Sequence, residues 1–449
     1  MLSYLEHVAE RFDLNRDIQL GTRVTAATFD EASERWEVRT DTGDVVSARF
    51  LIAALGALSA ANVPDVPGLE NFTGERYHTA EWPHEGVDFT GKRVGLIGTG
   101  ATGIQVATEL AEQADHLTVF QRTPDYAVPL GNHPLDAEFR RRYKESYDEI
   151  WEQVRHNFSG HDYEPIGKSL EEATPEERER AFQERYDRGG FGLWLANYDD
   201  ILVSREANGT VSEWVRERIA ERIDDPATAE KLTPSDHAFG TKRVPLENGF
   251  YEIFNRDNVE IVDVQKAPIL EITQSGVRTQ DGEYEFDALV FATGFDAMTG
   301  PYNKIDIQGR GGQLLRDKWA EGPHTYLGLM SAGYPNMFAI TGPQSPSVLT
   351  NMPVAIEQHV DWISGIIQYM LDNDLDTVEP TRKAEDEWVN HSQEVAYATL
   401  LPESATWYMG ANIPGKPQVF LPYLGGLGAY RQKCDEVAEN DYEGFAFTS

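Results

Sequence analysis

The sequence predicts an α/β fold with Rossmann-like parallel strands and an inserted helical domain. A strand, a glycine-rich turn and a helix follow one another over residues 93–113, and a second strand follows at 116–120. Apolar, strand-like segments return only at 259–264 and 288–292. Residues 133–238, which lie between them, are rich in Glu and Arg and have helical periodicity. This order indicates a parallel sheet whose chain is interrupted by helices.

The N-terminal residues predict a helix, a hairpin and a strand. Residues 1–12 have the spacing of an amphipathic helix, and alternating residues at 23–29 and 36–40 predict a hairpin. The apolar segment 50–56 predicts a buried strand that ends in glycine. The Pro- and Gly-rich segment 63–68 indicates a linker between domains.

Further helices are expected in the insert and in the second half of the chain. Helical periodicity in the insert covers 139–151 and 213–223, and Thr174-Pro175-Glu176-Glu177 predicts a capping box with Pro at the first helical position. Another helix is expected near 353–370. Residues 407–449 are rich in Gly, Pro and aromatic residues, which predicts a loop-rich cover over a site.

The composition is that of a folded protein without a membrane span. Hydrophobic residues make up 40% of the chain, which is enough for a sizeable core. No run of about 18 apolar residues occurs, and the first residues lack the features of a signal peptide. Cys434 is the only cysteine, so neither an intrachain disulfide nor a zinc cluster is expected. His156 and His161 are too loosely spaced to argue a metal site, and a cytoplasmic location is the simplest interpretation.

The net charge is strongly negative. The chain has 75 Asp and Glu against 39 Lys and Arg, a formal charge of −36. Repulsion of this size destabilises a compact fold, and at about 1 M salt a Debye length of roughly 3 Å screens most of it. The charge therefore predicts a halophilic protein, with an ordinary acidic enzyme as the alternative. Nucleic acid is not an expected partner, because it is a polyanion.

Residues 98–103 fit the pattern G-x-G-x-x-G between a strand and a helix. Gly98 allows the tight turn, Gly100 lets a pyrophosphate approach the backbone, and Gly103 permits close helix–strand packing. The helix N-terminus offers free N–H groups to phosphates. We expect this segment to bind a dinucleotide through Gly98, Thr99, Gly100, Ala101, Thr102, Gly103 and Gln105. The alternative is a chance glycine-rich turn.

The end of the second strand distinguishes between two cofactors. An NAD site usually has Asp or Glu at this point, which binds the ribose 2′-hydroxyl. Here the strand is followed by Arg122 and Thr123, and a guanidinium suits a 2′-phosphate. We therefore expect NADP, with a surface arginine of no special role as the alternative.

Phe72, Gly74, His78, Trp82 and Pro83 match the pattern F-x-G-x-x-x-H-x-x-x-W-P. This pattern resembles the fingerprint of Baeyer–Villiger monooxygenases, which are flavin-containing class B enzymes. Without the resemblance, these side chains would be interpreted as packing residues. The resemblance implies that they couple domain motion to catalysis.

The resemblance extends over essentially the whole chain and is closest to the phenylacetone and cyclohexanone monooxygenase branch. The segments that carry it are 240–243, 291–296, 342–347 with Asn351-Met352, and Trp407 with 410–416. It implies an active-site role for Arg243, NADP contacts from Thr241 and Lys242, a flavin-side position for Met352, and closure over NADP by the loop that carries Trp407. A permanent guanidinium suits an oxyanion site.

The resemblance also implies the reaction. NADPH reduces FAD, the reduced flavin traps O2, and a ketone substrate becomes an ester or lactone. The alternatives are nitrogen or sulfur oxygenation by a related flavin enzyme, or an NADP-binding remnant without FAD and without oxygenase activity.

One part of the family pattern has no counterpart in this sequence. Members begin with a strand and a first G-x-G-x-x-G that holds the ADP part of FAD, and residue 1 falls inside that pattern. We therefore expect an N-terminally incomplete FAD domain, explained by a late start, a fragment, a separate chain that supplies the segment, or real loss. The expected domains are 1–58 with 295–449 for FAD, 59–132 with 239–294 for NADP, and the helical insert 133–238.

Overall fold

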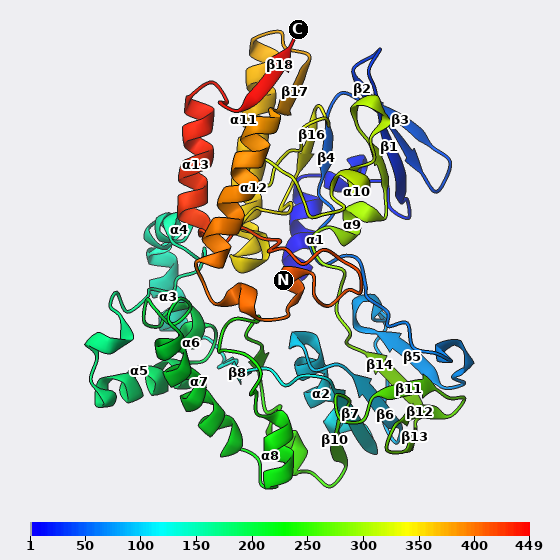
Figure 1. The fold of residues 1–449 in the computed structure, drawn as a ribbon, viewed down its shortest axis with the longest axis vertical. Coiled ribbons are helices and arrows are strands. Elements are labelled where there is room, and N and C mark those ends of the chain that lie inside the picture. The colour runs from blue at the N-terminus through cyan, green and yellow to red at the C-terminus, as the bar shows by residue number, and fades with distance from the viewer. Residues whose placement is uncertain (1) are drawn as a thin grey trace.

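The computed structural model describes residues 2–449 and has an upper lobe and a lower part (Figure 1). The lower part contains a five-stranded parallel sheet in the order β10-β7-β6-β14-β5. Its strands are β5 (Glu75–His78), β6 (Arg93–Ile97), β7 (His116–Gln121), β10 (Val259–Asp263) and β14 (Ala288–Phe291). Because the strands come from both sides of the insert, the interrupted parallel sheet that the sequence predicts is confirmed.

The centre of this sheet is buried on both faces. Helix α2 (Ala101–Gln113) joins β6 to β7 and packs Ile104, Ala107 and Leu110 against them. On the other face Phe120, Phe286 and Leu289 form a second apolar cluster. A three-stranded antiparallel sheet of β11 (Ile269–Ile272), β12 (Gly276–Thr279) and β13 (Glu283–Glu285) contributes to that cluster.

The insert between β7 and β10 contains six α-helices, as expected. They are α3 (Ala137–Glu145), α4 (Tyr147–His156), α5 (Pro175–Arg188), α6 (Gly192–Leu195), α7 (Arg205–Ala220) and α8 (Pro226–Leu232). The helical periodicity of 139–151 is confirmed, with α3 and α4 separated only at Ser146. The capping box at Thr174 is present, with Pro175 in the first turn. Phe182 and Trp214 belong to the same buried cluster as the sheet, so insert and sheet share one core.

The upper lobe combines a four-stranded sheet and two two-stranded sheets with three long helices. A mixed sheet has the order β15-β1-β2-β3, and β16 pairs in parallel with β4. The strands are β1 (Val24–Asp30), β2 (Arg35–Thr40), β3 (Val45–Ala48), β4 (Leu51–Ala53), β15 (Asp306–Gln308) and β16 (Met337–Ala339). The buried strand expected at 50–56 is only partly correct, because β4 has three residues and Ile52 is 46% exposed.

The helices of the upper lobe are α11 (Met352–Asp372), α12 (Arg382–Tyr397) and α13 (Leu427–Glu439). The expectation of a loop-rich tail was wrong for its second half, which contains α13 and β18 (Phe445–Thr448). Leu427, Tyr430, Cys434 and Val437 are buried on one face of α13, at spacings of three and four residues. This helical period was present in the sequence. β18 pairs with β17 (Thr377–Pro380).

The remaining elements are short, apart from the first helix. They are α9 (Gly300–Asn303), α10 (Leu315–Lys318), and β8 (Val128–Pro129) paired with β9 (Leu246–Glu247). Helix α1 (Leu2–Arg11) confirms the expected N-terminal helix, and none of its residues is buried. Among residues 2–449, no helix is both long enough and apolar enough to cross a membrane.

Candidate active site between the two lobes

The glycine-rich turn lies where the sequence predicts, between the end of β6 and the first turn of α2. A Cβ atom at Gly98 would lie 2.5 Å from the carbonyl oxygen of Ala292, and one at Gly103 would lie 2.1 Å from that of Gly98. A Cβ atom at Gly100 would have no neighbour within 4 Å. Two of the glycines are therefore required by protein packing, whereas the third leaves open space at the helix N-terminus, where a phosphate is favoured.

The other predicted residues of this segment lie around the same turn. The Thr99 hydroxyl donates to the carbonyl oxygen of Thr123 at 3.3 Å, which joins the turn to the end of β7. Thr102 and Gln105 are exposed on α2, as is Arg122 after β7. Within residues 2–449 the Arg122 guanidinium has no ion-pair partner, so its charge is available to a ligand.

His78 connects the end of β5 to the two segments in which the chain passes from one lobe to the other. Its Nδ1 accepts from the Ala80 N–H at 3.1 Å, and its Nε2 lies 3.3 Å from the Thr293 hydroxyl. That hydroxyl donates to the carbonyl oxygen of Asn62 at 2.6 Å. His78 must therefore carry its proton on Nε2 and donate it to Thr293. The three residues join β5 to the first crossing (57–62) and the second crossing (292–298).

The remaining fingerprint residues pack within the lower part. Phe72 is buried, and a Cβ atom at Gly74 would meet its ring at 2.5 Å and the Asp287 carbonyl oxygen at 2.6 Å. Trp82 packs against Tyr77 and Phe89, with ring centroids 5.8 and 6.0 Å away. Pro83 follows it and is partly buried.

Lys242 lies beside a carboxylate that the sequence interpretation did not identify. Its Nζ is 3.8 Å from Asp236 Oδ2, and Asp236 Oδ1 is 2.7 Å from Nδ1 of the buried His237. Burial opposes ionisation of Asp236, but the His237 hydrogen bond and the charge of Lys242 hold its pKa below the ordinary value. Nε2 of His237 lies 3.4 Å from Asp125.

Thr241 is fully buried, and its hydroxyl is already hydrogen-bonded within the protein. Its hydroxyl donates to the carbonyl oxygen of Ala238 at 2.7 Å and lies 2.6 Å from the Ser404 hydroxyl. Both of these contacts are within the protein. Thr241 therefore connects the end of the insert to the C-terminal part of the chain.

Arg243 reaches from this segment to the upper lobe. Its Nη1 donates to the carbonyl oxygen of Val348 at 3.0 Å, and its guanidinium lies 5.1 Å from the ring centroid of Phe191. Burial raises the pKa of Tyr408 to about 12, although the charge of Arg243 opposes the shift. Burial, followed by the charge of Arg243, lowers the pKa of His161. A permanent cation thus lies among groups that are neutral at neutral pH.

The loop after β16 has an unusual backbone. Thr341, Gln344 and Ser347 have positive φ values of 52°, 64° and 40°, and all three side chains are buried. Non-glycine residues in this region cost free energy and occur preferentially at functional sites. The loop follows the carboxyl ends of the parallel strands β4 and β16, which is where ligands bind in open α/β sheets.

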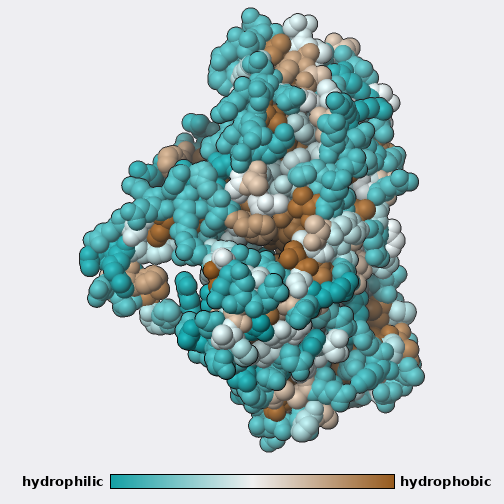
Figure 2. Space-filling view, turned by 60° about the vertical axis from the view of Figure 1, so that its left-hand side comes forward, coloured by the Kyte–Doolittle hydropathy of each residue, from teal (hydrophilic) through white to brown (hydrophobic). Residues whose placement is uncertain are grey.

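Met352 and Trp407 both contact one apolar cluster, which includes Met298, Val348 and Tyr408. The structure thus brings Met352, Trp407 and Arg243 together around Val348 and Tyr408. Figure 2 shows hydrophobic side chains gathered in a hollow between the lobes. The C-terminal segment that contains Trp407 lies at this junction in Figure 1.

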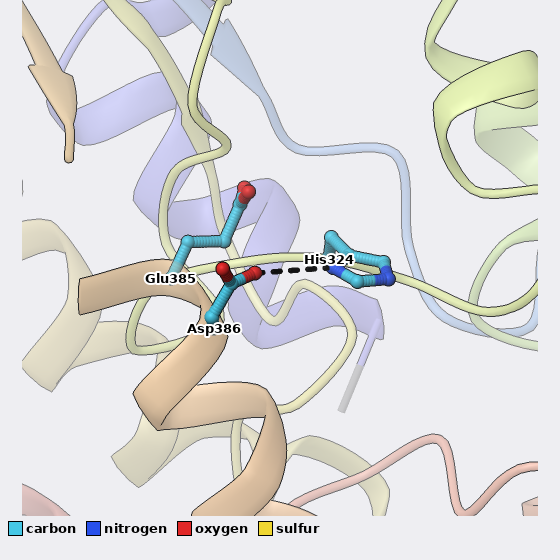
Figure 3. A group of neighbouring side chains, drawn as sticks. All are labelled: His324, Glu385 and Asp386. Carbon is cyan, nitrogen blue, oxygen red and sulfur yellow. Dashed lines mark ion pairs between the residues drawn. The ribbon is translucent and has the colours of Figure 1, made fainter. Parts of the chain in front are cut away.

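One cluster of possible metal ligands lies in the upper lobe, formed by His324, Glu385 and Asp386 (Figure 3). The Glu385 carboxylate already has partners within the protein. Lys318 Nζ lies 2.8 Å from both of its oxygens, and the Ala332 N–H donates to it at 2.8 Å. His324 Nδ1 and Asp386 Oδ1 are 4.0 Å apart. These contacts favour an ion-pair cluster over a metal site.

The sequence interpretation missed Asp236 and Tyr408, and it did not foresee the pairing of Lys416 with Asp296, although both lie in segments that carry the resemblance. The pair spans 120 positions of the chain, so no local pattern indicates it. Asp236 lies six residues before Lys242, and only the turn between them brings the two side chains together.

Comparison with known proteins gives a consistent result. A family model described as pyridine nucleotide-disulphide oxidoreductase matches residues 1–169. A Baeyer–Villiger monooxygenase of Pseudooceanicola batsensis is 44% identical over 98% of this chain and 81% of its own length.

Solved structures are similar over the full chain. The OTEMO complex with FAD and NADP has a TM-score of 0.97 at 41% identity, and the match covers 100% of this chain and 84% of that one. Cyclohexanone monooxygenase has a closed structure with a TM-score of 0.97 at 45% identity and an open structure with 0.92 at 44%. Both matches cover 100% of this chain and 84% of the other.

Proposed function

The chain belongs to the Baeyer–Villiger monooxygenase family, and we propose that it converts a ketone to an ester or lactone with FAD, NADPH and O2. The observation that carries the proposal is the position of Arg243. It comes from the segment that follows the insert, and it bonds to Val348 in the loop next to β16. A permanent cation is thereby held at the junction of the two lobes, where both cofactors would meet.

The glycine-rich turn fits NADP. The open space at Gly100 leaves room for the pyrophosphate at the N-terminus of α2, where the first N–H groups of a helix have no intrahelical partner. Arg122 and Thr123 would bind the 2′-phosphate, and Lys242, oriented by Asp236, would bind a phosphate or ribose oxygen. The unpaired charge of Arg122 supports this assignment.

The loop after β16 fits the flavin end of FAD. The positive-φ residues Thr341, Gln344 and Ser347 shape its backbone, and Met352 follows in the first turn of α11. The pattern G-x-G-x-x-G occurs once in the sequence and is assigned to NADP. The residues named here therefore account for the flavin ring and not for the FAD pyrophosphate.

The cofactors, when bound, supply two electrons from NADPH and the activation of O2 by reduced FAD. The protein's own contribution centres on Arg243. As a ketone carbonyl is attacked, negative charge develops on its oxygen, and the guanidinium N–H groups stabilise that charge without losing a proton. The segment around Trp407 and Tyr408 excludes water from this position.

The domain boundaries that we propose follow the sheets. Residues 59–132 and 239–294 form the NADP domain, 133–238 form its insert, and 1–58 with 295–449 form the FAD domain. The five parallel strands of the lower sheet support this division, because all of them lie within the two NADP segments. The fingerprint residue His78 supports it too, since it bonds at the crossings between the segments.

The test is to identify the products from matched substrates. Purified protein is supplied with FAD and NADPH, and a cyclic ketone is compared with a thioether of similar size. Formation of the lactone with stoichiometric NADPH consumption supports the proposal. Exclusive formation of the sulfoxide would contradict it and would favour heteroatom oxygenation instead.

A further inference from the structure

A buried ion pair fastens the C-terminal loop 410–417 to the second crossing. Lys416 Nζ lies 2.6 Å from Asp296 Oδ1 and donates to the carbonyl oxygen of Ala297 at 2.6 Å. The Lys416 side chain is only 8% exposed, and that of Asp296 is 27% exposed. In the described part of the chain, neither side chain has another ion-pair partner.

A second residue of the loop strengthens this attachment. Asn412 Nδ2 donates to the carbonyl oxygen of Phe295 at 2.8 Å, so the loop contacts three consecutive residues of the crossing. The loop is folded on itself, because the Lys416 N–H donates to Ile413 and the Ile413 N–H donates to Gly410. It therefore moves as a unit when these contacts break.

The second crossing is itself bonded to the first crossing. The N–H of Asp296 donates to the carbonyl oxygen of Ala60 at 2.8 Å, and that of Met298 donates to Ala57 at 2.8 Å. The N–H of Asn62 donates to Gly294 at 2.9 Å. A rotation of the lobes about these crossings is thus transmitted to the residues that hold the loop.

One side of the loop faces a cavity. The cavity has a volume of about 390 Å³ and is lined by Lys416, Asp296 and Trp319 among others. The loop also follows directly on the short helix Trp407–Met409, whose Tyr408 is buried near Arg243. Release of the loop would therefore open the surroundings of Arg243 to water.

We infer that Lys416 and Asp296 form a latch that keeps the C-terminal loop closed over the reaction centre, so that Lys416 is a positioning residue for the oxygenation. The inference rests on the proposed function and adds a residue pair to it. Loss of Asp296 leaves the Lys416 ammonium, which is only 8% exposed, without a counter-ion, and loss of Lys416 leaves the partly buried Asp296 carboxylate without one. Either loss therefore destabilises the closed arrangement more than an open one, in which each charge is solvated. The TM-score of the whole chain is 0.97 with the closed and 0.92 with the open structure of cyclohexanone monooxygenase.

The first readout is hydrogen–deuterium exchange of backbone amides in residues 406–417, with NADP present. Lys416→Met and Asp296→Asn are each expected to increase exchange in this segment by about tenfold or more. In the double variant the two effects should not add, because neither charge is then left without a partner. Unchanged exchange in the single variants, or fully additive effects, would overturn the latch.

The second readout is the fraction of consumed NADPH that produces H2O2 instead of ester. Each single variant should raise this fraction by about twofold or more, because water reaches the site. If the wild-type chain produces no ester, the proposed function fails, but the exchange experiment still decides the latch. If the wild-type chain produces ester and exchange is unaffected in the variants, only the latch is wrong.

Lys318→Met is the matched control. Lys318 forms a comparably buried pair with Glu385 at 2.8 Å, in the upper lobe. Its loss should lower the melting temperature without a selective increase of exchange in residues 406–417. The same selective increase in this control would show that general destabilisation, and not the latch, opens the loop.

Discussion

Arg243 is the residue on which the chemistry depends most directly. Its guanidinium bonds to Val348 and lies against Phe191, while Tyr408 and His161 nearby stay neutral at neutral pH. The sequence motif identified Arg243 only by resemblance. The contacts that give the charge its position come from segments up to 105 residues away, and no local pattern indicates them.

Substitution of Arg243 should separate NADPH oxidation from oxygenation. In Arg243→Ala the NADP turn is untouched, so NADPH oxidation persists, whereas ester formation falls by about 100-fold or more because one oxyanion donor is lost. Parallel measurement of NADPH consumption and ester yield checks this. Normal ester yield from the variant would remove Arg243 from its assigned role.

Arg122 should determine the preference for NADPH over NADH. A charged hydrogen bond contributes about 1.5–3 kcal/mol, so Arg122→Ala is expected to reduce the NADPH to NADH ratio of kcat/KM by about 10- to 100-fold. The value for NADH itself should change little, because NADH has no 2′-phosphate. An unchanged ratio would mean that another cation binds the phosphate.

His359 makes the stability of the upper lobe dependent on pH. Its Nδ1 accepts from the Thr341 N–H at 2.9 Å and its Nε2 lies 3.1 Å from the Tyr430 hydroxyl, which donates to Leu327. The ring is therefore neutral, with its proton on Nε2. Burial, followed by the charge of Arg431, lowers the pKa of His359 to about 3 from its ordinary value of 6.5.

The unfolded chain thus binds this proton between about pH 6.5 and pH 3, while the folded chain does not, so stability falls as pH falls through that window. At pH 5 the loss relative to pH 7.5 is about 2 kcal/mol from this group. Urea unfolding at both pH values should show the loss in the wild type and a smaller one in His359→Gln. Equal losses in the two proteins would contradict the assignment.

Among the helices and strands, the sequence predicted correctly those whose extent depends on interactions between residues close together in the chain. The strand ending at Ile97, the turn and the helix from Ala101 to Gln113 were predicted residue by residue, because glycine spacing and apolar period both act over a few positions. β4 was expected to be longer and buried, and its extent depends instead on pairing with β16, almost 300 residues later. Thr241 likewise owes its buried position to Ser404, 163 residues away.

The glycine-rich turn allows folding and ligand binding to be tested separately. Gly100→Ala adds a methyl group in open space at an ordinary φ of −75°, so the melting temperature should be unchanged while NADP affinity falls. Gly103→Ala places the methyl group against the Gly98 carbonyl, so it should lower the melting temperature as well. Calorimetric titration with NADP together with thermal unfolding distinguishes the two. Undiminished NADP binding in Gly100→Ala would contradict the assignment of this turn to the NADP pyrophosphate.

For the whole molecule, the dominant property is the net charge of −36. Many acidic side chains are paired, as Asp287 and Glu285 are with Arg93, but an excess of 36 acids cannot be. Their repulsion destabilises the folded state and is screened within a Debye length of about 8 Å at physiological salt and about 3 Å at 1 M. A halophilic origin stays a prediction, and its physical consequence can be measured.

The melting temperature should rise steadily as KCl is increased from 0.1 M to 2 M. The increase should be largest at the low end, where screening changes most. At a pH near 5, where part of the carboxylates are protonated, the same series should give a smaller increase. A melting temperature that does not depend on salt at neutral pH would show that the repulsion is already compensated within the fold.

The central claim is that one oxygen atom of O2 is inserted next to a ketone carbonyl at the expense of NADPH. The most direct measurement is to incubate the protein with FAD, NADPH and a cyclic ketone under 18O2 and to analyse the product by mass spectrometry. The account predicts a lactone that contains one 18O atom per NADPH consumed in the productive reaction. NADPH oxidation that produces H2O2 alone, or a lactone without the label, would contradict it.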